Sequence, residues 1–277
     1  MQYRQAIKEN IGIEENEFVP GYSRNDGLRF DENDEIHKMM DSMSEIIFKI
    51  FEPMPGKISS ILDIGAGAGS LACFLRIQDP DVRVVTVDGN EETNRSPFIE
   101  KEDHFIVRTD QEYKIVDENN EVVKFDLIVS FEHLEHIHED NFEQFLENMY
   151  VHSHEKTVFF GTAANWEYEK EDEKHIHCNV KNHLEWREYL KTQKGSFGVY
   201  NLGPLARLVD DEASGSLLTE KSIEDAEKLF TCLPRFAQVI FDGLIDYYPN
   251  SLPWAHRLFN SSVIFGELLN NKNVEDR

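Results

Sequence analysis

The sequence predicts an α/β fold with a doubly wound, mostly parallel sheet of seven strands. Short apolar segments rich in β-branched residues recur through the first 165 residues, and segments with helical spacing of apolar residues separate them. A turn with three glycines lies between the first of these strands and the helix that follows it. Strands and helices that alternate in this way are typical of a parallel sheet with helices on both faces.

The glycine-rich turn lies in Ile61-Leu-Asp-Ile-Gly-Ala-Gly-Ala-Gly-Ser70. Residues 61–64 form a short apolar run, as in a strand buried on both faces, and residues 71–75 have helical spacing, so a helix begins near Ser70. Glycines permit a tight left-handed turn and let a ligand lie against bare backbone. The helix N-terminus adds free N–H groups and a partial positive charge. The turn therefore predicts a ligand site or, alternatively, glycines that serve only packing.

The spacing of this turn resembles the first motif of the class I S-adenosylmethionine-dependent methyltransferases. It is not the dinucleotide fingerprint Gly-x-Gly-x-x-Gly, because Ser70 occupies the third place. The resemblance implies that the acidic residue at the strand end faces the amino acid part of S-adenosylmethionine, and that the glycines pass under the cofactor. The implied contacts are Asp63, Gly65, Ala66, Gly67 and Gly69.

Three further predicted strands, at 82–88, 104–110 and 125–131, end in residues that the same resemblance places around the cofactor. A carboxylate at the end of the second strand can accept two hydrogen bonds from the vicinal hydroxyls of a ribose. The alternative for each acidic residue is an ordinary turn. The resemblance implies contacts from Asp88 and Gly89 to the ribose, from Asp110 and Gln111 to the adenine, and from Ser130 and Phe131 to the methionine end.

The segment Glu132-His-Leu-Glu-His-Ile137 has three interpretations. A histidine could be the general base that takes a hydroxyl proton, because its free pKa of about 6.5 suits that work. Side chains three and four apart on a helical turn could instead bind a metal, which resembles the metal-dependent 2′-O-methyltransferases of small RNAs. The turn could also only shape the cofactor pocket. The candidate bases are His133, His136 and His177, and the metal set would be Glu132, Glu135, His136 and His175.

We expect residues 1–56 to form an N-terminal cap, with a helix from Asn33 to Phe51, and residues 57–277 to form the cofactor-binding domain. Later strands are expected at 157–161, 198–201 and 260–265. In the family the last strand is antiparallel at the edge of the sheet. Residues 201–258, roughly, are expected to form a helical insertion that covers the site or provides a homodimer face.

The C-terminal part resembles a subgroup of class I enzymes that is often found among glycan-modification genes. The resemblance is carried by His177-x-Asn179, by Trp186 and by Pro253-Trp254. It implies a sugar or another small polar molecule as the methyl acceptor.

The composition excludes some partners. The chain has 28 Lys and Arg against 53 Asp and Glu, a net charge of −25, which repels phosphate backbones and anionic membranes.

The three cysteines are scattered and form no disulfide framework, and no apolar run is long enough for a leader or a membrane span, so we expect a cytoplasmic protein. The fourth strand lacks an Asn/Asp-Pro-Pro-Tyr/Phe sequence, which disfavours methylation of nucleobase amines.

These observations predict an S-adenosylmethionine-dependent methyltransferase that transfers a methyl group to a hydroxyl of a sugar or another small polar molecule. One alternative is a metal-dependent RNA 2′-O-methyltransferase, which the charge disfavours. The other is a protein that binds the cofactor without catalysis.

Overall fold

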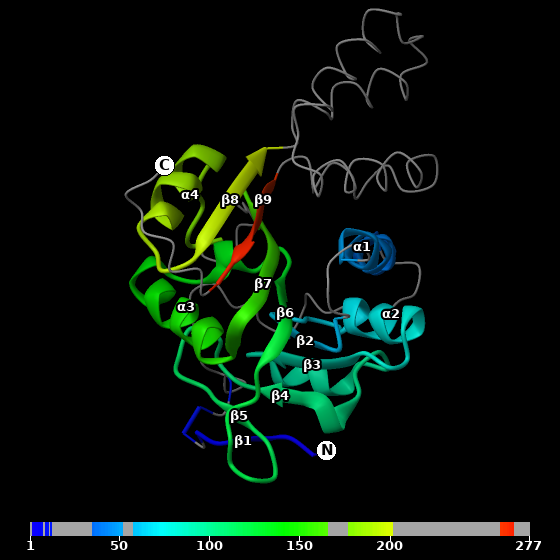
Figure 1. Ribbon diagram of the computed structural model, residues 1–277. Helices are drawn as coiled ribbons and strands as arrows, with labels where there is room; N and C mark the ends of the chain where they lie inside the picture. Colours follow the sequence, from blue (N-terminus) through cyan, green and yellow to red (C-terminus); the bar gives the residue numbers. More distant parts are fainter. Residues whose placement is uncertain are drawn as a thin grey trace, which may run out of the picture.

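The computed structural model describes residues 2–7, 9–10, 12, 35–51, 58–165, 177–201 and 261–268. Seven strands form one sheet in the order β4-β3-β2-β6-β7-β9-β8 (Figure 1). The predicted doubly wound, mostly parallel sheet of seven strands is therefore confirmed.

The five parallel strands all present their carboxyl ends to one edge of the sheet. From β2 the chain winds outward to β3 and β4, then returns to the other side of β2 and continues with β6 and β7. The strand order therefore reverses between β2 and β6, and open α/β sheets bind their ligands in a crevice at such a point. The strands are β2 (Ser60–Ile64), β3 (Arg83–Asp88), β4 (His104–Ile106), β6 (Phe125–Ser130) and β7 (Ser153–Ala164).

The last strand corrects one expectation. β9 (Ser261–Glu267) is antiparallel, but it lies between β7 and β8 (Ser196–Asn201) instead of at the sheet edge. Its residues 261–264 are all buried, so both rows of its backbone groups need partners, and two neighbouring strands supply them. β8 forms the edge.

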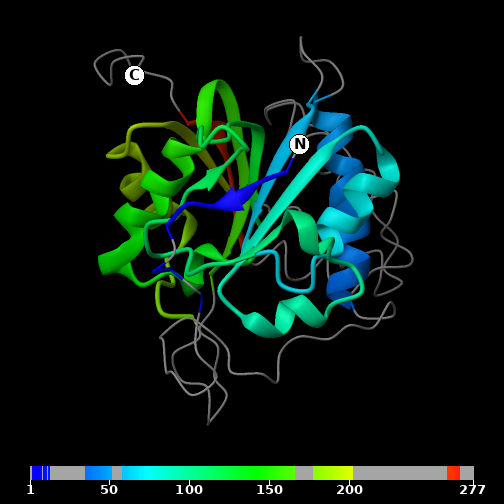
Figure 2. The same cartoon turned by 90° about the horizontal axis from the view of Figure 1, so that it is seen from below.

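Helices cover both faces of the sheet (Figures 1 and 2). α1 (Glu35–Phe51) packs against α2 (Ser70–Gln78) on one face, while α3 (Phe142–Val151) and α4 (His183–Lys191) lie on the other. Four short 3₁₀ turns complete the connections: η1 (Glu91–Arg95), η2 (Lys101–Asp103), η3 (Leu134–His136) and η4 (Glu139–Asn141).

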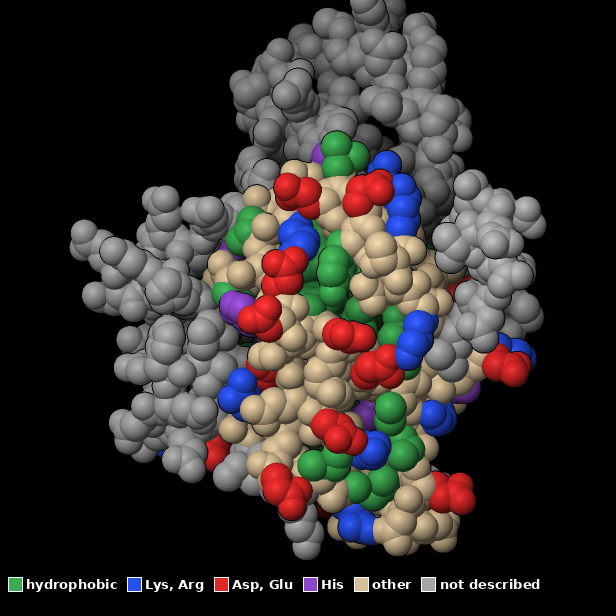
Figure 3. All heavy atoms as spheres, turned by 90° about the vertical axis from the view of Figure 1, so that its left-hand side faces the viewer, with side chains coloured by type: hydrophobic (Ala, Val, Ile, Leu, Met, Phe, Trp, Pro, Cys, Tyr) green, Lys and Arg blue, Asp and Glu red, His purple; other side chains and the backbone are tan. Residues whose placement is uncertain are grey.

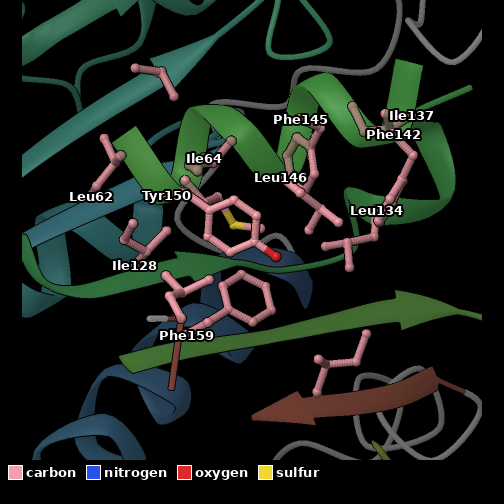
Figure 4. Close-up of a cluster of buried hydrophobic side chains, with 14 of the residues drawn as sticks. Leu62, Ile64, Ile128, Leu134, Ile137, Phe142, Phe145, Leu146, Tyr150 and Phe159 are labelled. Atoms are coloured by element: carbon pink, nitrogen blue, oxygen red, sulfur yellow. The ribbon is translucent and has the colours of Figure 1, made fainter. Parts of the chain in front are cut away.

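An aromatic core fixes α3 and α4 to the sheet. Phe142 and Phe145 of α3 are fully buried, and Phe142 lies 5.3 Å, centroid to centroid, from Trp186 of α4. Tyr150 of α3 lies beside Phe159 of β7 (Figure 4). Large rings bury much apolar area, so this packing holds the carboxyl ends of β6 and β7 rigidly in place.

A second, two-stranded sheet was not expected. β1 (Arg4–Gln5) pairs antiparallel with β5 (Ile115–Val116), so part of the segment expected to be a polar cap is a strand (Figure 2). The sequence carries no alternating apolar pattern here, because a strand of two residues needs none.

Several expectations fall outside the described residues, namely the helical insertion, His175 and Pro253-Trp254. Among the helices that the structure describes, none has the length and apolar content to cross a membrane. On the face formed by α3 and α4, acidic and basic side chains are interspersed (Figure 3), with ion pairs such as Lys194–Glu147 and Lys181–Glu139.

Candidate functional site

The glycine turn between β2 and α2 lies at the carboxyl edge of the sheet. Gly65, Gly67 and Gly69 all have positive φ, at 74°, 52° and 77°, which side chains rarely tolerate. The N–H groups of Gly65 and Ala66 both donate to the carbonyl of Val87, which fixes the turn against β3. The prediction of a tight left-handed turn at these positions is confirmed.

The same turn leaves no room for side chains on its inner surface. A Cβ at Gly65 would lie 2.3 Å from Cγ of His133, and a Cβ at Gly69 would lie 2.3 Å from Cγ1 of Ile99. At these two positions glycine is therefore required by close packing against the protein's own side chains, as well as by the backbone conformation.

Asp63 is buried at the end of β2, and its Oδ2 has no hydrogen-bond partner. Desolvation by burial, followed by the nearby carboxylate of Asp88, raises the pKa of Asp63 to about 7, and Arg76 offsets part of this. An unpartnered buried oxygen is costly and calls for a donor. The ammonium group of S-adenosylmethionine would supply one, so the residues present fit this cofactor.

Asp88 closes the turn from the end of β3. Its Oδ2 accepts from the N–H of Gly67 at 2.8 Å and its Oδ1 from the N–H of Asn90 at 2.8 Å. Burial raises the pKa of Asp88, and these N–H groups offset part of that effect. A carboxylate oxygen has two lone pairs, so each can still accept a ribose hydroxyl. Gly89 follows directly, and its carbonyl lies against Gly12 of the N-terminal segment.

Asp110 lies near the expected adenine position, but its carboxylate is already engaged. Arg108 donates to both of its oxygens, at 3.1 and 2.9 Å, and Asn141 donates to Oδ2 at 2.9 Å. Asp110 therefore orders its own loop, and contact of Asp110 and Gln111 with adenine stays a prediction.

Two asparagines that no sequence pattern identified hold the loop that contains Asp110. Asn10 donates to the carbonyls of Arg108 and Glu112 and accepts from the N–H of Arg108. Asn148 of α3 donates to the carbonyls of Thr109 and Gln111. An isolated asparagine carries no pattern in the sequence, so no signal pointed to either residue.

Ser130 and Phe131 lie at the end of β6, in the crevice. The Ser130 hydroxyl donates to the carbonyl of Ile64 at 2.9 Å and so joins β6 to β2. Phe131 packs edge-on against Phe160, with ring centroids 5.1 Å apart. Both side chains brace the pocket, and a direct contact with the cofactor stays a prediction.

The turn after β6 is unusual in its backbone. Glu132 has a φ of 50°, although it is not a glycine. Its N–H donates to Thr162 Oγ1 at 3.0 Å, and its Oε1 accepts from Ser261 Oγ at 2.7 Å. Residues in this conformation are held there by their surroundings and often lie at functional sites. Here β7 and β9 together hold the turn.

This turn brings Glu135, His136 and His177 together. Oε1 of Glu135 lies 3.9 Å from Nε2 of His136 and 4.0 Å from Nε2 of His177, and one ligand atom of each residue lies within 4.8 Å of the others. The two imidazole rings meet edge to face, 4.9 Å apart. The Asn179 N–H donates to the Glu135 carbonyl at 2.9 Å and ties the segment of His177 to the turn.

Glu135 is fully buried, and neither carboxylate oxygen has a hydrogen-bond partner. Its pKa is raised well above the usual range, chiefly by desolvation and then by the carboxylate of Glu132. A buried carboxyl group that faces two imidazoles is a strongly perturbed group of the kind found at functional sites.

His133 has a different environment. Its ring lies under Gly65, and its Nε2 is 2.8 Å from Thr109 Oγ1. Burial lowers the pKa of His133 to about 4, although Asp110 partly offsets this. A histidine with this pKa is neutral and a weak base at neutral pH, so the geometry favours a positioning role for His133 over proton transfer.

Comparisons with known proteins agree with this geometry. Residues 62–158 match the family model described as "Methyltransferase domain". No curated protein matches the chain significantly.

Among solved structures, the plantazolicin methyltransferase BpumL with SAH is 12% identical, with a TM-score of 0.53, over 86% of this chain and 87% of that chain. BpumL with a triazolic desmethylPZN analog is 11% identical, with a TM-score of 0.56, over 85% and 86%. The plantazolicin methyltransferase BamL is 12% identical, with a TM-score of 0.54, over 88% and 89%. At this identity the likeness shows the fold.

Residues 62–158 of this chain thus match the model of a methyltransferase domain, and the chain has the class I methyltransferase fold, whose cofactor is S-adenosylmethionine.

Proposed function

We propose that this protein is an S-adenosylmethionine-dependent methyltransferase that methylates a hydroxyl of a sugar or another small polar molecule. The observation that carries the proposal is the cluster of Glu135, His136 and His177 at the carboxyl edge of the sheet, next to the end of β6. A hydroxyl is a weak nucleophile until it loses its proton, so an enzyme that alkylates one needs a group that activates it.

Different residues of the chain bind the methyl donor and activate the methyl acceptor. Asp63, the glycine turn and Asp88 hold and orient the donor, which supplies an electrophilic methyl group when it is bound. On the other side, an imidazole of His136 or His177 can take the proton of the acceptor hydroxyl. His136 is the more accessible of the two, since its side chain is 20% exposed and that of His177 is 7% exposed. Oε1 of the buried Glu135 carboxyl group lies 3.9 and 4.0 Å from the Nε2 atoms of these two rings.

The choice of a sugar rests on the segment that follows the fifth parallel strand. His177-x-Asn179 and Trp186 carry the resemblance to the glycan-modification subgroup, and Asn179 is the residue that anchors His177 to the catalytic turn. The plantazolicin methyltransferases were solved with azolic desmethylPZN analogs, so acceptors on this fold need not be nucleic acids. We also propose a cytoplasmic location and a homodimer through the insertion.

The test is a methylation assay with labelled S-adenosylmethionine and a panel of sugar nucleotides, glycans, primary amines, carboxylates and small RNAs. We expect label in a base-stable ether on a sugar or another small polar hydroxyl compound. Label only in amines, carboxylates or RNA would overturn the choice of acceptor. Cofactor binding by calorimetry without methylation of any acceptor would instead support a binding protein.

A matched pair of variants tests the catalytic cluster. Replacing His136 with Gln should lower kcat by about 100-fold or more, because general-base catalysis contributes about 10²–10⁴-fold. Replacing His154 with Gln is the control, since His154 also pairs with a carboxylate, that of Asp126, but at the start of β6. Equal activity of both variants would exclude His136 as the activating group.

A further inference from the structure

The carboxyl group of Glu135 is the least satisfied polar group of the described site. It is fully buried, both oxygens lack hydrogen-bond partners, and no lysine or arginine forms an ion pair with it among the described residues. Buried carboxylates in proteins are paired with cations or bind metals. The groups that face this one are two imidazoles, which are themselves metal ligands.

We propose that Glu135, His136 and His177 bind one divalent transition-metal ion, which holds the hydroxyl of the methyl acceptor. This inference rests on the proposed function and deepens it: the ion takes over from an imidazole base the activation of the acceptor hydroxyl, and His136 and His177 act through the ion as its ligands. It differs from the metal set expected from sequence in two members. His177 lies in the cluster, whereas His175 is outside the described residues, and Glu132 does not belong to the cluster.

The distances suit a small ion. One ligand atom each of Glu135, His136 and His177 lie within 4.8 Å of one another, and a point equidistant from the three atoms lies about 2.5 Å or less from each. Zinc-like ions bind such ligands at ~2.0–2.2 Å. Small side-chain movements would bring the three ligand atoms to the shorter distances found in metal sites. Two imidazoles and one carboxylate also favour first-row transition metals over Mg²⁺ and Ca²⁺, which prefer oxygen ligands.

The cluster is fixed by its surroundings, as a metal site requires. The N–H of Asn179 donates to the carbonyl of Glu135, and the Cys178 thiol donates to the carbonyl of His136 at 3.2 Å. These two contacts set the segment 177–179 against the turn.

Three protein ligands leave open positions on the ion for an acceptor. A hydroxyl bound there is more acidic than a free one, because the cation stabilises the alkoxide. The hydroxyl proton then passes to solvent water, the new carbon–oxygen bond forms as the carbon–sulfur bond of the donor breaks, and S-adenosylhomocysteine leaves. In this arrangement both imidazoles serve as ligands, and the cation activates the hydroxyl.

The experiment is a titration of the metal-free full chain with Co²⁺, followed by calorimetry and by the visible absorption that reports cobalt coordination. We expect one ion per chain and absorption bands typical of nitrogen and oxygen ligands. Replacing Glu135 with Gln or His177 with Gln should weaken binding by at least 10-fold, and replacing His154 with Gln should leave it unchanged. Retained binding of S-adenosylhomocysteine shows that each variant is folded.

Absence of stoichiometric binding, or binding that both cluster variants leave intact, would overturn the metal site. Its failure is distinct from failure of the proposed function. If no ion binds but hydroxyl methylation persists after chelation, the function stands and the metal site falls. If the ion binds as expected but no hydroxyl is methylated, the site stands and the proposed function falls.

Discussion

At the scale of single residues, we expect Asp63 to determine how tightly the donor is held. Its pKa of about 7 means that it ionises in the neutral range, and an ammonium group binds better to the ionised form. We expect the affinity for S-adenosylhomocysteine to rise several-fold between pH 6 and pH 8, and the Asp63→Asn variant to bind weakly with a flat pH profile. Calorimetry at three pH values checks this, and equal wild-type affinities at pH 6 and 8 would contradict it.

Gly65 combines a positive φ with contact to the ring of His133. The Cβ of an alanine would clash with this ring. An alanine would also be strained at this φ, which costs about 1–3 kcal/mol of stability. We expect Gly65→Ala to lower cofactor affinity at least 10-fold and to lower the melting temperature. The double variant with His133→Ala should recover part of the stability, because only the backbone strain remains. If the double variant is no more stable than the single one, the ring contact is not the cause.

Residue patterns allowed part of the site to be predicted. The glycine spacing and Asp88 were visible because a turn with bare backbone leaves few residue choices. The distinction between His133 and His136 was not visible. The two rings lie three residues apart in one motif, yet one is packed under Gly65 and the other faces Glu135. Burial decides their chemistry, and burial depends on distant segments.

At the scale of elements, α3 is joined to β5 through His152. The N–H of Ile115 donates to Nε2 of His152 at 3.0 Å, and the ring Nδ1 lies 2.7 Å from the carbonyl of Asn148. Nε2 must therefore be unprotonated and Nδ1 protonated. Burial lowers the pKa of His152 to about 4, which agrees with a neutral ring.

This pKa predicts an acid-sensitive junction. His152 binds a proton near pH 6.5 in the unfolded chain, but only near pH 4 in the folded chain. The contribution of His152 is therefore complete above pH 6.5 and is lost as the pH falls through 4, by ~3 kcal/mol in all. We expect His152→Gln to be less stable at pH 7.5 but to lose less stability between pH 6.5 and 4. Urea unfolding at several pH values measures this, and parallel pH profiles would contradict it.

Elements with strong patterns were predicted well. The helix at 35–51, the turn into α2 and the central strands follow apolar periodicity, which reports burial directly. The strand β1 was missed and the place of β9 was wrong, because both depend on which distant strand supplies the hydrogen bonds. Local sequence does not contain that information.

At the scale of the whole molecule, the charge of −25 governs partners and salt response. Like charges repel within the folded chain, and added salt shortens the screening length of this repulsion from ~30 Å at 0.01 M to ~8 Å at 0.15 M. We expect the melting temperature to rise by a few degrees over this range, and the protein to bind no small RNA at 0.15 M salt. Calorimetry and gel-shift assays test both. Tight RNA binding would favour the RNA 2′-O-methyltransferase over a small acceptor.

The pairing of β1 with β5 has a consequence for biosynthesis. Arg4 pairs with Val116, more than a hundred positions later in the chain. At a translation rate of about 5–20 residues per second, the early strand leaves the ribosome some ~6–20 s before its partner exists. During that interval the nascent segment has no strand to join, and Asn10 has no loop to hold. The loop that contains Asp110 is consequently held in place late, after the glycine turn has already been synthesised.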